Sequence, residues 1–74
     1  MEAGSRITDE RVSVGNLVEV SFLGSTATGI ITLKVLIDEV NQYHYDILIL
    51  ECPWKKQINR KIGRSIKDIK EIIA

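Results

Sequence analysis

Hydrophobic and polar residues alternate along two stretches of the chain, and each stretch predicts a half-buried β-strand. The first runs from residue 12 to residue 22 and the second from residue 31 to residue 38. The side chains expected to face the core are Val12, Val14, Val18, Val20 and Phe22 in the first strand, and Ile31, Leu33, Val35 and Ile37 in the second. Lys34 is expected on the outer face of the second strand.

A third strand is predicted from Tyr43 to Glu51, because the apolar residues 47–50 follow one another without interruption. Such a run is typical of a strand buried on both faces, so this strand is expected in the centre of the sheet. Pro53 ends the sheet, because proline has no N–H group to donate to a neighbouring strand.

The hydrophobic period changes after Pro53. Trp54, Ile58 and Ile62 are spaced by four residues, which predicts a short helix. From Ser65 onward the isoleucines fit a second helix, although an isoleucine-rich closing strand fits them too. The fold class expected from these patterns is α+β: a small antiparallel sheet with a short helix after its third strand, and a C-terminal segment that is helix or closing strand.

The size of the chain predicts one small domain. Residues 1–10 are polar and without pattern, so they are expected to be a flexible lead-in, and residues 11–74 are expected to form the domain. A single cysteine excludes an internal disulfide, and no apolar stretch is long enough to cross a membrane. Without a signal-peptide pattern at its start, the chain is expected to be cytoplasmic.

The candidate chemistry is sparse. One histidine and one cysteine exclude an ordinary zinc site of several His and Cys ligands, and the glycines form no phosphate-binding loop. Along one strand, His44 and Cys52 would be roughly 26 Å apart, too far for a nucleophilic pair. We therefore expect no enzyme, no metal and no cofactor.

The formal charge of the chain is zero, yet the charges are unevenly distributed. Residues 1–51 carry eight acids and three bases, whereas residues 52–74 carry seven bases and two acids. On the predicted helix, Lys56, Arg60 and Arg64 would lie on one face, opposite the apolar stripe. Such a face is suited to an anionic partner, either nucleic acid or an acidic protein surface.

Two segments resemble a known family. The segment Val12-Ser13-Val14-Gly15-Asn16-Leu17-Val18-Glu19-Val20 is similar to the opening strand, V-x-x-G-S-x-V-x-L, of the C-terminal domain of the GreA/GreB transcript-cleavage factors and their relatives. The segment from Cys52 to Gly63 resembles the family's S-P-L-G-K-A-L-L-G-K-K-V-G with one residue missing. The similarity covers residues 12–66.

This resemblance implies an FKBP-like α+β fold and docking on RNA polymerase in transcription. The polymerase-facing loop of the family maps to Cys52, Pro53 and Trp54. The family's N-terminal coiled coil, which bears the catalytic acids, has no counterpart here, so cleavage-stimulating activity is not implied. The expected function is that of a non-catalytic interaction module, with Cys52, Pro53, Trp54, Lys56, Arg60 and Arg64 as partner-binding residues.

Two other functions stay open. The first is a small SH3-like or Sm-like β-barrel that binds nucleic acid through the basic segment 55–70. The second is an accessory or inhibitor protein of a mobile element. A helix over residues 54–63 favours the Gre-like fold, whereas a turn and a strand there favour the barrel.

Overall fold

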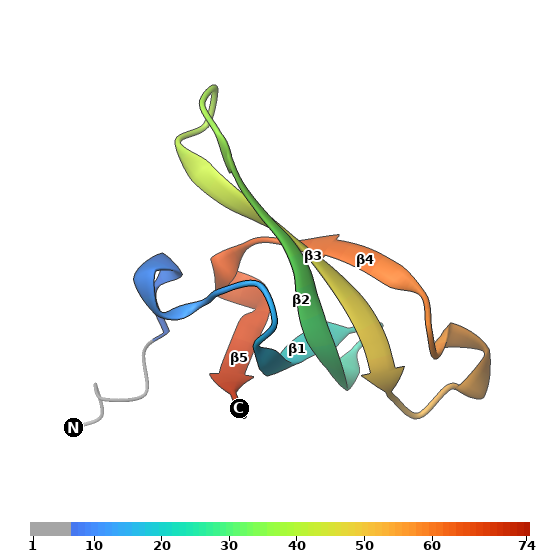
Figure 1. Cartoon of the computed structure of the whole chain (residues 1–74). Helices are drawn as coiled ribbons and strands as arrows, with labels where there is room; N and C mark the ends of the chain where they lie inside the picture. Colours follow the sequence, from blue (N-terminus) through green and yellow to red (C-terminus); the bar gives the residue numbers. More distant parts are fainter. Residues whose placement is uncertain (1–6) are drawn as a thin grey trace.

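The computed structural model describes residues 7–74, and these form one antiparallel sheet (Figure 1). In spatial order its five strands are β4-β3-β2-β1-β5. Their bounds are β1 (Leu17–Phe22), β2 (Ser25–Ile37), β3 (Gln42–Glu51), β4 (Lys61–Arg64) and β5 (Ile69–Ile72). Three single-turn 3₁₀ helices lie outside the strands: η2 (Asp9–Arg11), η3 (Lys55–Gln57) and η4 (Ile66–Asp68).

Tight turns join the first three strands. Leu23 and Gly24 connect β1 to β2, and both have positive φ, as a two-residue hairpin turn of type I′ requires. β2 and β3 pair up to the Ile37–Gln42 register position and form a long hairpin that projects beyond the rest of the sheet (Figure 1). Asn41, with φ of 54°, completes the turn at its tip.

One face of the sheet carries the core. The fully buried residues include Val18 and Val20 of β1, Ile31 of β2 and Ile47 of β3. The complete set of buried hydrophobic residues is Val12, Val18, Val20, Phe22, Ala27, Ile31, Tyr45, Ile47, Ile49 and Ile69. Since no helical layer covers this face in residues 7–74, the sheet itself curls around the core, and we call this face the inner face.

The expected α+β class is wrong, because the described chain is mostly β and has only 3₁₀ turns in place of helices. The helix predicted over residues 54–63 ends after the single turn η3. Asn59 then takes φ of 74°, and Ile62 pairs with Ile47 as part of β4. The four-residue spacing of Trp54, Ile58 and Ile62 fits a helix. Residues 61–64 instead pair with β3, which satisfies their backbone hydrogen-bonding groups, and this pairing outweighs the helical pattern.

Of the two predictions for the C-terminal segment, the closing strand is the correct one. After the turn η4, residues 69–72 pair with β1 as the edge strand β5. Ile69 and Ile72 sit opposite Val20 and Val18 and therefore face the core. A turn and strand over residues 54–64, followed by a closing strand, are the features that favour the barrel alternative over the FKBP-like fold.

Two expectations about strand faces also need correction. A β-bulge at Thr32 reverses the orientation of the rest of β2, so Lys34 lies on the inner face while Leu33, Val35 and Ile37 lie on the outer face. β3 is not buried on both faces, because its buried residues alternate with partly exposed ones and Leu50 is exposed. In the first predicted strand, Val14 precedes β1 and is exposed.

The segment before β1 packs on this sheet. Ile7 contacts the core, and Tyr45 donates a hydrogen bond to the carboxylate of Asp9. The Lys34 ammonium donates to the backbone carbonyl oxygens of Asp9 and Val12 at 2.6 and 2.8 Å. Residues 1–6 of the predicted lead-in lie outside the described residues.

Candidate functional site

The loop between β3 and β4, residues 52–60, holds most of the residues that the sequence singles out. Hydrogen bonds fix it at its end: Asn59 N–H donates to the carbonyl of Ile49, and Ile49 N–H donates to the carbonyl of Arg60. At its start, the Cys52 thiol and the Gln57 N–H both donate to the carbonyl of Trp54, at 3.1 and 3.0 Å. The loop is therefore a firmly held projection from the end of β3.

Trp54 is both anchored and accessible. Its ring makes a T-shaped contact with Phe22, with 6.1 Å between the ring centroids and 74° between the planes. Phe22 is buried, whereas Trp54 keeps 39% of its surface exposed. Side-chain contact with a core residue restricts the motion of the indole, so it offers an ordered aromatic surface to solvent.

The seven lysines and arginines of residues 52–74 divide into three groups by their position in the structure. Lys55, Lys56 and Arg60 are exposed on the loop itself, and Lys61 follows as the first residue of β4. No acidic residue lies between Glu51 and Asp68 in the chain, so the loop has no acid of its own to neutralise this charge. Arg60 reaches only the Gln57 side chain, at 3.2 Å.

The Arg64 side chain contacts β1 and does not extend from the loop surface. Its guanidinium donates to the carbonyl of Ser21 at 3.3 Å and lies 5.9 Å from the centroid of the Phe22 ring. The predicted basic helix face of Lys56, Arg60 and Arg64 does not exist, because Arg64 lies in a strand and turns toward β1.

Lys67 and Lys70 form the third group, away from the loop. They line an open pocket of about 560 Å³ between the segment before β1 and the segment that contains η4 and β5. In Figure 1, η3 and β5 lie on opposite sides of the molecule. The basic segment 55–70 is therefore divided between two places, and the loop with Trp54 is the part that combines several cations with an aromatic ring.

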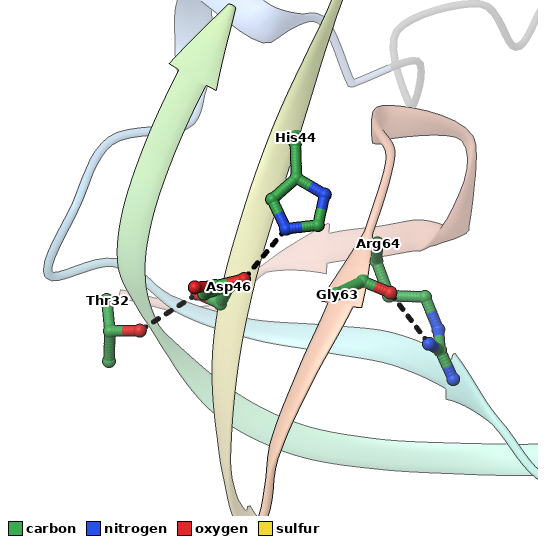
Figure 2. A network of polar contacts seen from close by, with 5 residues as sticks. All are labelled: Thr32, His44, Asp46, Gly63 and Arg64. Carbon is green, nitrogen blue, oxygen red and sulfur yellow. Dashed lines mark hydrogen bonds and ion pairs between the residues drawn. The ribbon is translucent and has the colours of Figure 1, made fainter. Parts of the chain in front are cut away.

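A polar cluster that the sequence analysis missed lies on the outer face (Figure 2). His44 and Asp46 of β3 are joined at 2.7 Å between Nε2 and Oδ1, and the Thr32 hydroxyl donates to the carbonyl of Asp46 at 3.2 Å. The imidazole lies over Gly63 of β4, where an added Cβ would be 2.5 Å from its Cε1 atom. Spacing of two residues along one strand was the signal for this pair, because such residues share a face.

His44 and Cys52 have separate hydrogen-bond partners. The Cys52 thiol is bonded to the Trp54 carbonyl, and His44 bonds to Asp46, so the two form no nucleophilic pair. In the part of the chain that the structure describes, no three His, Cys, Asp or Glu side chains gather into a group that could hold a metal ion. Between residues 7 and 74, no helix has the length and apolar character that a membrane crossing needs.

The loop combines an exposed indole, a hydrogen-bonded backbone and exposed cations with no acid among residues 52–60, and these can hold an anionic or aromatic ligand without covalent chemistry. The chain matches no protein-family model, no curated protein and no solved structure.

Proposed function

We propose that this chain is a non-catalytic binding module that holds single-stranded nucleic acid on the β3–β4 loop. The binding surface consists of the Trp54 ring and the cations of Lys55, Lys56 and Arg60. The observation that carries the proposal is the exposed Trp54 ring, held against Phe22 and followed directly by exposed cations.

Single-stranded nucleic acid suits this surface for two reasons. An exposed aromatic ring stacks on any base, because every base presents a π face, at about 1–3 kcal/mol per base. Neighbouring lysines and arginines attract the phosphates and release counterions when the strand binds. An acidic protein surface would use the cations but would not require an exposed indole beside them.

Docking on a protein such as RNA polymerase is the competing function. The resemblance to the transcript-cleavage factors maps polymerase contacts to Cys52, Pro53 and Trp54, and Pro53 and Trp54 are exposed at the same loop. That expectation depended on an FKBP-like fold with a helix at residues 54–63. The turn and strand found there make the nucleic-acid alternative the better supported one.

The test uses Trp54 as its own probe, since it is the single tryptophan of the chain. Titration with a short oligouridine should quench its fluorescence. With three phosphates neutralised, one by each of these cations, the affinity should fall by about 20-fold between 50 and 200 mM salt. The double variant Lys55→Glu/Lys56→Glu should weaken binding by a similar factor or more, and Trp54→Leu should weaken it by about tenfold, measured by anisotropy of a labelled oligonucleotide.

Lys67→Glu/Lys70→Glu is the matched control, because it changes the net charge equally on the other side of the molecule. This variant should keep most of the affinity. The proposal fails when no salt-dependent complex forms, or when both double variants lose affinity equally. Capture of purified RNA polymerase through Trp54 without any RNA complex would assign the loop to protein docking instead.

A further inference from the structure

The outer face of the projecting β2–β3 hairpin carries a column of exposed hydrophobic side chains. Leu33, Val35 and Ile37 of β2 are 45%, 40% and 37% exposed. Their partners on β3 are Asp46, His44 and Gln42, so an apolar column on β2 lies beside a polar column on β3. Contiguous apolar side chains on the surface of a small soluble domain indicate an interaction site.

The polar column does not prevent burial of this face. The Asp46 carboxylate is hydrogen-bonded to the His44 ring at 2.7 Å, so the acid already has a partner within its own chain (Figure 2). A paired carboxylate loses less on leaving water than an unpaired one does. The face can therefore pack against another sheet face at the usual separation of about 10 Å.

The charged residues at the two ends of the outer face indicate which partner covers it. Asp38 and Glu39 at the tip of the hairpin are exposed, and they lie at one end of the outer face. At the other end, Lys61 of β4 is also exposed. Lys61 pairs with Leu48 of β3, and Leu48 pairs with Ile30 of β2, so these three residues form one row across the outer face. One face thus presents an acidic end, an apolar middle and a basic end.

Such a surface is complementary to itself under a two-fold rotation. The two-fold axis lies between the two sheets and runs perpendicular to the strands at the level of Val35. It places Leu33 of one copy over Ile37 of the other. Strands advance about 3.4 Å per residue. The bulge at Thr32 adds no step to the ladder, so Ile30 lies four ladder steps from Val35; in the opposite direction the ladder ends two steps from Val35, at the Ile37–Gln42 pair, where the turn that holds Glu39 begins. The hairpin tip of each copy, which carries Glu39, is then directed toward the end of the face that carries Lys61 of the other copy.

We infer that two copies of this chain form a symmetric dimer through the outer face of the β2–β3 hairpin. Symmetric pairing is the commonest form of assembly for soluble proteins, and it requires a surface that complements itself. Zero net charge means that two copies do not repel each other as a whole. This inference does not depend on the nucleic-acid proposal, because Trp54 and the loop lysines are outside the paired face.

Sedimentation equilibrium measures the assembly directly. The wild-type chain should show twice its mass of 8.3 kDa. Val35→Glu should weaken dimerisation by about a hundredfold or more, because each dimer loses two apolar contacts and buries two charges. Leu23→Glu is the matched control: Leu23 is 58% exposed, but it lies in the β1–β2 turn, beyond the reach of the second copy.

A charge exchange tests the pairing without touching the apolar column. Glu39→Lys and Lys61→Glu should each weaken the homodimer, since each places like charges opposite one another. An equimolar mixture of the two should form a heterodimer, because both contacts then join opposite charges. Circular dichroism confirms that each variant is folded.

Three outcomes overturn the inference. The wild-type chain stays a monomer at high concentration, which would leave the face to a different partner. Leu23→Glu disrupts the dimer as strongly as Val35→Glu does. Mixing Glu39→Lys with Lys61→Glu restores no dimer.

Discussion

At the scale of single residues, two glycines show how the same residue type serves different ends. Gly29 of β2 faces the core, where an added Cβ would be 2.5 Å from Cγ2 of Ile47 and 2.7 Å from the backbone oxygen of Leu48. Gly63 of β4 lies under the imidazole of His44, which is a half-exposed side chain that can rotate away. Neither glycine has a positive φ, so close approach and not backbone conformation explains each of them.

The two glycines therefore predict different costs for one methyl group. Gly29→Ala should destabilise the fold by about 1–3 kcal/mol, because the backbone of β3 cannot move away without breaking the sheet. Gly63→Ala should cost much less, and the additional change His44→Ala should remove most of that cost. Urea unfolding measures both free energies, and equal losses at the two positions would contradict the assignment of His44 as the yielding neighbour.

At the scale of elements, the sequence pattern predicts the strands well and their connections poorly. Alternation correctly indicates the first two strands, and the core positions Val18, Val20 and Ile31 follow from it, while the uninterrupted apolar run of residues 47–50 correctly indicates the third strand. The bulge at Thr32 has no sequence signal of its own, yet it reverses every side chain from Leu33 to Ile37. A simple period of two therefore places Lys34 outside and the three apolar residues inside, which is the reverse of the structure.

The loop after β3 shows the other limit. Its spacing fits a helix, and only pairing with β3, a contact distant in sequence, selects β4 for Lys61–Arg64. Of the candidate binding residues, Trp54, Lys56 and Arg60 do lie on one loop. Arg64 is turned toward Ser21 by that same strand, and a helical wheel cannot anticipate it.

Lys34 of β2 and Tyr45 of β3 face inward, and both form hydrogen bonds with the segment before β1. Tyr45 is fully buried and donates to Asp9 of η2 at 2.5 Å. Burial raises the pKa of Tyr45, and the hydrogen bond to the Asp9 carboxylate raises it further. Because the ionised phenolate is excluded from the fold, stability is retained below pH 10, near the ordinary tyrosine value, and falls as pH rises above it.

Tyr45→Phe tests this connection between η2 and β3. The variant should lose about 1.5–3 kcal/mol at neutral pH, the usual contribution of a hydrogen bond to a charged group. Above pH 10 the difference from the wild type should shrink, because phenylalanine has no proton to lose. Chemical denaturation at pH 8 and pH 11 checks both statements, and a constant difference over that range would contradict them.

At the scale of the whole molecule, the unevenly distributed charges of the chain belong to two different proposed surfaces. The acidic tip and Lys61 belong to the dimer face, while Lys55, Lys56 and Arg60 belong to the loop that we propose binds nucleic acid. A symmetric dimer carries two such loops. If both proposals hold, each dimer binds a long strand through two sites and a short strand through one.

Two linked sites predict that affinity depends on the length of the strand. The second loop binds at an effective concentration near millimolar, which raises the overall affinity by about 10²–10⁴-fold when one strand reaches both loops. The monomeric variant Val35→Glu should therefore lose about a hundredfold in affinity for an oligouridine of about 30 nucleotides and change less than about twofold for one of about 6 nucleotides. Anisotropy at fixed salt measures both. An equal loss at the two lengths would place Val35 within the nucleic-acid site, and no loss at either length would mean that the two loops of a dimer do not bind one strand together.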